Sequence, residues 1–84
     1  MRIIRVAKKS IQYPDDPVSF FRILEDAEEE IKSFLGYNVR IYAVRKGKEG
    51  NIVEMRFSDP YHQIVGIYYP EEGKIEHWRG VITS

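Results

Sequence analysis

The second half of this chain carries four short stretches in which apolar and polar residues alternate, separated by polar turns. Alternation with a period of two residues is typical of β-strands that bury one face. The stretches span residues 39–44, 52–57, 64–69 and 75–82. Because the turns between them are short, consecutive strands are expected to pair as antiparallel neighbours, and the pattern predicts a four-stranded meander.

One amphipathic helix is predicted just before these strands. Asp16 is placed to accept from the free amides of the first turn, Pro17 suits the first helical position, and Gly36 suits the helix end. Apolar residues share one side of this helix: Phe20, Leu24, Ala27, Ile31 and Phe34, with Phe21 and Leu35 widening the stripe. Acidic residues fill the other side: Glu25, Asp26, Glu28, Glu29 and Glu30. We expect the acidic side to be an ordinary solvated surface.

A further strand is predicted near the N-terminus, where Ile3, Ile4 and Val6 occur close together. This strand is expected to add to an edge of the sheet or to reach a partner. The element order β-α-β-β-β-β predicts a single α+β domain over residues 1–84, in which the helix packs on one face of the four-stranded antiparallel meander.

The alternation also predicts which strand residues face the helix. The residues assigned to the helix-covered face are Val39, Ile41, Ala43, Val53, Met55, Phe57, Val65, Ile67 and Tyr69. Two facings remain open for the last strand, because a slip of one residue swaps the two faces. Either Ile75, His77 and Val81 point toward the helix, or Trp78 and Ile82 do.

The opposite face of the sheet is predicted to be rich in aromatic, aliphatic and arginine side chains. Its residues are Arg40, Tyr42, Val44, Ile52, Glu54, Arg56, Ile64 and Tyr68. One helix cannot cover both faces, and an open apolar patch marks an interaction site. Three roles remain open for this face: a homodimer or partner interface, a surface covered by the N-terminal segment, or a nucleic-acid platform in which Tyr42 and Tyr68 stack on bases.

Composition narrows the choice of partner and compartment. Thirteen basic and thirteen acidic side chains give a net charge of zero, whereas nucleic-acid binding relies on a basic surface, so nucleic acid is not the expected partner. No apolar run approaches the ~20 residues of a membrane span, and charges interrupt the N-terminal apolar run, so we expect a cytoplasmic protein. Many charged residues and the absence of cysteine also resemble the composition of thermophile proteins.

No catalytic, metal or cofactor site is predicted. The absence of cysteine excludes disulfides and thiolate metal sites. His62 and His77 are the two histidines, and the predicted hairpin separates them by about 13 Å, which is too far to share one ion. The serines lack a nucleophile motif, and the glycines lack the strand–loop–helix context of a phosphate loop.

Residues 27–78 resemble a PepSY-type domain. The resemblance rests on a helix that ends at a glycine and on a final hairpin that reads IVGIYYPEEGKI, from Ile64 to Ile75. The chain departs from the family where Tyr68, Tyr69 and Pro70 displace the usual acidic residue before the turn. The resemblance implies a small non-catalytic module of a binding or inhibitory type.

We therefore expect a non-enzymatic interaction module that forms a homodimer or binds a protein partner. Its expected interaction residues are Arg40, Tyr42, Arg56, Tyr68 and Trp78. A chain this short gains stability when a second copy buries more of its surface. Two alternatives remain open: a small ligand-binding protein or enzyme with a pocket between helix and sheet, which a lining by Tyr69 or His77 would favour, and a nucleic-acid accessory protein.

Overall fold

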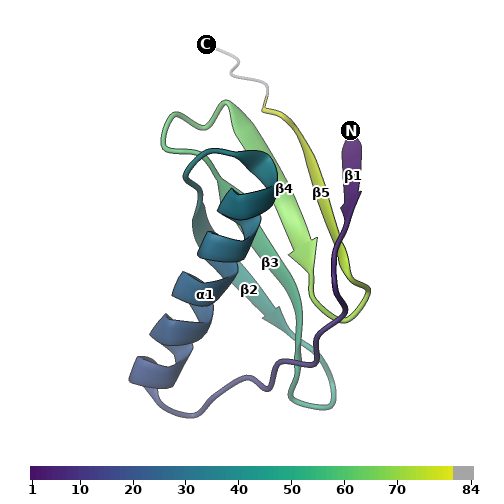
Figure 1. Cartoon of the computed structure of the whole chain (residues 1–84). Helices are drawn as coiled ribbons and strands as arrows, with labels where there is room; N and C mark the ends of the chain where they lie inside the picture. Colours follow the sequence, from purple (N-terminus) through teal and green to yellow (C-terminus); the bar gives the residue numbers. More distant parts are fainter. Residues whose placement is uncertain (81–84) are drawn as a thin grey trace.

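The computed structural model describes residues 1–80. Its five strands are β1 (Arg2–Arg5), β2 (Arg40–Lys46), β3 (Ile52–Ser58), β4 (Ile64–Tyr69) and β5 (Lys74–Arg79). They form one antiparallel sheet in the order β1-β5-β4-β3-β2, and helix α1 (Pro17–Leu35) lies across one face of it (Figure 1). The α+β class and the element order are confirmed. The meander gains a fifth strand, because β1 pairs with the outer edge of β5.

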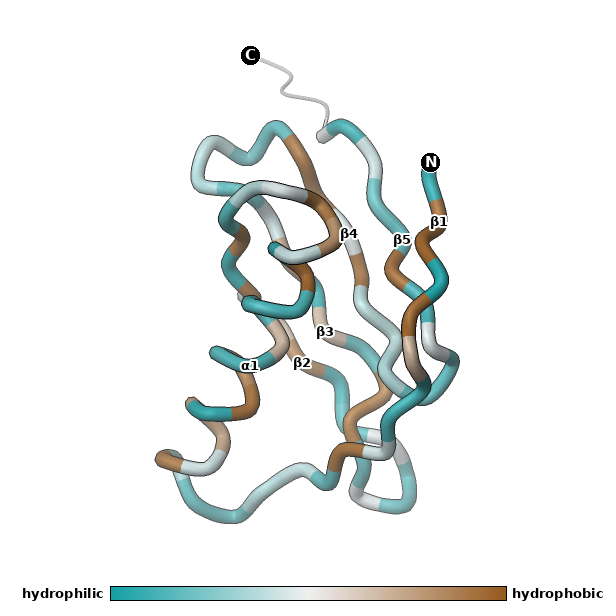
Figure 2. Tube along the Cα trace, in the orientation of Figure 1, coloured by the Kyte–Doolittle hydropathy of each residue, from teal (hydrophilic) through white to brown (hydrophobic). Residues whose placement is uncertain are grey.

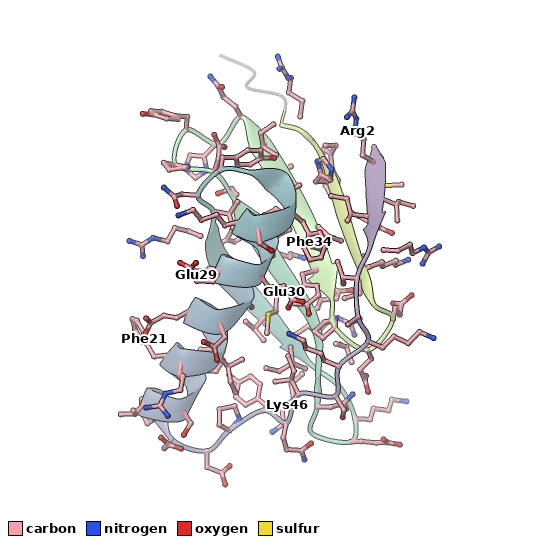
Figure 3. The ribbon with its side chains drawn as sticks, in the orientation of Figure 1. Arg2, Phe21, Glu29, Glu30, Phe34 and Lys46 are labelled. Carbon is pink, nitrogen blue, oxygen red and sulfur yellow. The ribbon has the colours of Figure 1, made fainter. Side chains whose placement is uncertain are left out.

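Helix α1 begins and ends at the predicted residues. The Asp16 carboxylate accepts from the Ser19 amide at 2.9 Å, and Gly36 closes the helix with a φ of +85°. Ala27 and Ile31 are buried against the sheet. Phe21 instead points away from the sheet and is 65% exposed, so its place in the predicted apolar stripe is wrong (Figure 3).

The segment between β1 and α1 holds the two hairpin ends of the sheet together. The Val6 amide donates to the Gly73 carbonyl at 2.9 Å, and the Ile52 amide donates to the Ile11 carbonyl at 2.8 Å. Gly73 has a φ of +68°, and a Cβ there would lie 2.7 Å from the Val6 carbonyl oxygen. A glycine is therefore required both by the turn and by the chain that crosses it.

The core lies between α1 and the sheet, and Figure 2 shows hydrophobic residues on the helix and along the strands. Its buried members are Ala27, Ile31, Val39, Ile52, Met55, Phe57, Tyr68 and Ile75. Partly buried side chains from the N-terminal segment, among them Val6, Ile11 and Tyr13, pack against this core. The segment between β1 and α1 thus lies on the helix side of the sheet. Strand β1 itself pairs with β5, so the prediction that the N-terminal strand adds to an edge of the sheet is confirmed.

The predicted facing of β4 is wrong. Tyr68 points toward the helix, so by alternation Val65, Ile67 and Tyr69 face away from it. The reason lies at Gly66, which pairs with Phe57 across β3 and β4. A Cβ on Gly66 would lie 2.3 Å from a Phe57 ring carbon, so the ring occupies the place that a side chain would take.

Two register shifts explain the remaining errors of facing. The first lies between Ile41 and Ala43, so Val39 and Ile41 face the core as predicted while Ala43 and Val44 exchange sides. The second lies between Arg45 and Lys46. A bulge of this kind inserts one residue and inverts the alternation beyond it. The second shift changes the facing at the start of β3. Ile52, predicted on the outer face, is buried in the core, and Val53, predicted to face the helix, is half-buried and is not part of the core.

The alternation leaves two facings open for the last strand, and in the structure Ile75 and His77 point toward the helix. Ile75 pairs with Tyr68 and His77 pairs with Gly66, so both lie on the helix side. Trp78 therefore faces away from the helix. Val81 and Ile82 lie outside the described residues.

Candidate functional site

The sheet surface that faces away from α1, called the outer face below, is built from three rows of paired residues. The rows are Trp78–Val65–Ser58–Arg40, Ile3–Glu76–Ile67–Arg56–Ala43 and Arg5–Lys74–Tyr69. Its aliphatic and aromatic side chains gather on β4, β5 and β1. Ile3 is 48% exposed and Trp78 is 37% exposed. Helix α1 lies on the other side of the sheet (Figure 1).

Several charged side chains on the outer face form ion pairs with one another. Arg45 contacts Glu54 at 2.9 Å, and Arg56 reaches the other carboxylate oxygen of Glu54 at 3.7 Å. The hydrogen bond from Arg45 lowers the pKa of Glu54. Lys74 contacts Glu76 at 3.1 Å, and that hydrogen bond raises the pKa of Lys74. Exposed pairs of this kind contribute little to stability, but they leave few uncompensated charges across the centre of the face.

Three of the five expected interaction residues lie on this face. Arg56 and Trp78 are in its rows, and Arg40, which pairs with Ser58 at the β2 edge, also lines a cleft beside the acidic side of α1. Tyr42 sits at the bulge of β2 and is 63% exposed. The placement of Tyr68 on this face is wrong, because its side chain is fully buried beneath the helix.

Tyr68 is part of a polar network between helix, sheet and N-terminal segment. Its hydroxyl donates to Glu30 Oε1 at 2.9 Å, and Lys9 Nζ donates to the same oxygen at 2.8 Å. Burial and then the Glu30 hydrogen bond raise the pKa of Tyr68 far above its usual value. Figure 3 shows Glu30 between the helix and the sheet. The phenol therefore stays protonated, which suits a structural link rather than a nucleophile.

A second acidic residue of α1 binds the free edge of the sheet. The Ile41 amide on edge strand β2 donates to Glu28 Oε2 at 2.9 Å. An unpaired strand edge invites pairing with another chain, and a side-chain acceptor there satisfies one of its donors. The prediction of an entirely solvated acidic side is therefore wrong for Glu28 and Glu30. Helical spacing alone did not reveal this, because the partners come from distant segments.

The turn between β3 and β4 brings together a serine, a histidine and an aspartate. Ser58 Oγ lies 3.3 Å from His62 Nδ1, and Asp59 Oδ1 accepts from the Ile64 amide at 2.9 Å. That hydrogen bond lowers the pKa of Asp59. A catalytic triad needs the carboxylate to orient the imidazole, whereas here it stabilises the turn. Within residues 1–80, no group of three or more histidine, aspartate or glutamate side chains is placed to hold a metal ion.

Comparisons with known proteins identify no family, because no family model, curated protein or solved structure matches this chain. The PepSY-type resemblance therefore stays a prediction. Among the described residues, no helix is long and apolar enough to cross a membrane.

Proposed function

We propose that this protein is a small, cytoplasmic, non-enzymatic interaction module that assembles as a homodimer through its outer face. The observation that carries the proposal is the uncovered second side of a five-stranded sheet, which presents Ile3, Val65, Ile67 and Trp78. Apolar residues gathered on one side of a sheet are favourable only when another layer covers them. Residues 1–80 supply one such layer, the helix, on the opposite side.

The size of the outer face suits a dimer. Five strands spaced by about 4.8 Å and about six residues long cover roughly 24 Å by 20 Å. Two such faces in contact bury on the order of 1,000 Å² in total, which is the lower limit for a specific interface. Two sheets stacked about 10 Å apart are also a common packing in β-sandwiches.

A second copy is favoured over a foreign partner by the charges of the face. A two-fold interface must be self-complementary, because each residue meets the same surface on the other subunit. On the outer face Arg45 and Arg56 contact Glu54, and Lys74 contacts Glu76. These pairs reduce the repulsion between two identical faces, on which Arg5 and Arg40 have no ion-pair partner among the described residues.

Cover by the N-terminal segment and binding of nucleic acid have less support as roles for the outer face. Residues 6–13 pack on the helix side, so they are not placed to cover the outer face. A nucleic-acid platform would rely on stacking by Tyr42 and Tyr68, and Tyr68 is buried. With a net charge of zero, the chain also has no overall excess of basic residues, on which phosphate binding relies.

The test is the molar mass of Ile67→Asp measured by light scattering over a wide range of protein concentration. Ile67 lies in the central row of the outer face, between Arg56 and Glu76. The wild type is expected at twice the mass of one chain, and the variant at the mass of one chain, because a desolvated carboxylate opposes the interface. Phe21→Asp, which places the same charge on the exposed side of α1, is the matched control and should remain dimeric.

Circular dichroism of both variants separates loss of assembly from loss of fold. A wild type that has the mass of one chain even at millimolar concentration would overturn the proposal. If folded Ile67→Asp remains a dimer, the interface lies on another surface of the protein.

A further inference from the structure

A groove lies on the helix side of the sheet, beside the C-terminal end of α1. The helix crosses the sheet on the side of β2 and β3, and β5 and β1 extend beyond it (Figure 1). The space left next to the helix has a volume of about 760 Å³. Pockets for small organic ligands span about 300–1,000 Å³, so this groove has the size of a ligand site.

The floor of the groove comes from paired residues of three strands. It is lined by Arg2 and Ile4 of β1, Ile64 of β4, and His77 and Arg79 of β5, with Arg2 opposite His77 and Arg79 opposite Ile64. All of these residues lie on the helix side, because Ile75 is part of the core and alternate residues share a face.

The wall of the groove comes from the end of the helix and the residues after it. Phe34, Leu35 and Tyr37 line it. Phe34 is 47% exposed and points toward the β4–β5 side of the helix, whereas Phe21 points to the opposite side (Figure 3). A large aromatic side chain held half in water at the rim of a groove is positioned to contact an apolar ligand.

Every charged side chain that lines the groove is basic. Arg2, Arg79 and the titratable His77 line it, and no aspartate or glutamate within residues 1–80 does. Neither arginine forms an ion pair with another residue of the described chain. Burial, and then the neighbouring charge of Arg2, lower the pKa of His77. In a chain with equal numbers of acidic and basic residues, this one-sided lining is a local feature.

We propose that the groove binds a small apolar carboxylate of the medium-chain fatty-acid type. The guanidinium groups of Arg2 and Arg79 hold the carboxylate, since the planar fork of arginine matches its two oxygens. The hydrocarbon chain lies along Ile4, Ile64 and Phe34. Most of the groove lies on the helix side of the sheet, and its lining also includes Ile3 and Trp78, which belong to the outer face. Ile67, the residue that the dimer test changes, does not line the groove, so the two proposals can be tested separately.

The test is titration of the untagged protein with decanoate by calorimetry, with decanol as the uncharged probe. Decanoate is expected to bind, and decanol to bind at least about tenfold more weakly, because a hydrogen bond to a charged group is worth about a factor of ten or more. Arg2→Ala and Arg79→Ala should each weaken decanoate binding by about tenfold and leave decanol binding nearly unchanged.

Phe34→Asp and Phe21→Asp form the matched pair for the location of the site. Both replace an exposed phenylalanine of the same helix, but only Phe34 lines the groove. Phe34→Asp should abolish decanoate binding, and Phe21→Asp should retain it. Chemical-shift changes of the Ile4, Ile64 and His77 amides on titration would identify the same site without any substitution.

The dimer experiment is independent of this one, because Ile67→Asp should bind decanoate as the wild type does. Absence of decanoate binding at millimolar concentration would overturn the proposal. Equal binding of decanoate and decanol, or equal binding by the two phenylalanine variants, would also overturn it.

Discussion

At the scale of single residues, two positions in β4 decide which face of that strand packs against the helix. Gly66 leaves room for the ring of Phe57, and Tyr68 reaches from the same strand to Glu30 on the helix. Both sit on the helix side of β4, where alternation along the sequence predicts Val65, Ile67 and Tyr69 instead. A buried hydroxyl must find a partner, and α1 provides one.

Tyr68→Phe should lower the free energy of unfolding by about 1.5 kcal/mol, because a hydrogen bond to a charged group is lost while Glu30 keeps its contact with Lys9. Chemical denaturation measures this change.

Wild-type stability should also fall as the pH rises above 10.0, the ordinary pKa of tyrosine. Above that pH the unfolded chain releases the phenolic proton and the folded chain retains it.

The pH dependence has its own control. The pKa values of Tyr37 and Tyr69 are raised as well, chiefly by burial, so they contribute in the same direction. Tyr68→Phe should therefore show a shallower loss of stability at high pH rather than none. An equal loss in wild type and variant would mean that the Tyr68 phenol is not protected in the folded state.

Gly66→Ala should cost about 3 kcal/mol, at the upper end for an overpacked site. The added methyl group would lie 2.3 Å from the Phe57 ring and 2.5 Å from the Glu76 carbonyl oxygen, and the backbone atom cannot move aside. Gly36→Ala is the comparison, since no atom lies within 4 Å of a Cβ there and only its φ of +85° opposes the change. It should cost about 1 kcal/mol by thermal or chemical unfolding. Equal costs at the two sites would contradict the packing argument.

At the scale of elements, α1 does more than cover an apolar surface. Its capping residues set its length, and its buried side packs on the sheet. Its acidic side also reaches the β2 edge through Glu28 and the N-terminal segment through the Glu30–Lys9 contact. The helix is thereby connected to segments at both sides of the core.

Glu28→Ala should destabilise the fold by about 1 kcal/mol, because the Ile41 amide loses its acceptor. Glu29→Ala is the matched control: this neighbouring acid is exposed, and Figure 3 shows it on the side of α1 away from the groove. Its removal should change the urea midpoint very little. Faster amide hydrogen exchange at Ile41 in Glu28→Ala alone would identify the bond directly, and equal exchange in both variants would contradict it.

At the scale of the whole molecule, the described residues 1–80 form a two-layer fold of one helix and one sheet, in which the helix covers one side of the sheet. The N-terminal strand β1 extends the sheet at its edge, and this enlarges the outer face while leaving it open. A chain of 84 residues buries a modest fraction of its surface, so cover from a second copy would contribute substantially to its stability.

If the folded protein is a dimer, its stability must depend on protein concentration. Each tenfold increase in concentration should raise the apparent free energy of unfolding by about 1.4 kcal/mol per mole of dimer. Trp78, the single tryptophan, lies on the outer face and reports unfolding by its fluorescence. The midpoint of Ile67→Asp should not depend on concentration. A wild-type midpoint with the same independence would contradict a dimer.

Much of the fold could be predicted because its signals are local. The capping positions of Asp16 and Gly36, the helical spacing and the short turns each depend on residues close together in the chain. These signals determined the α+β class, the order of elements and the bounds of the helix.

The tertiary structure alone decided which strand residues face the helix, and with them the candidate sites. A bulge after Ile41 and the glycine at position 66 invert faces at places where the alternation along the chain is regular. Tyr68 thereby moves into the core and Ile67 onto the outer face. Likewise, Arg2, Phe34 and Arg79 are brought to one groove by strand pairing and helix position. Spacing along the chain encodes local geometry, whereas register and contacts between distant segments depend on how side chains pack.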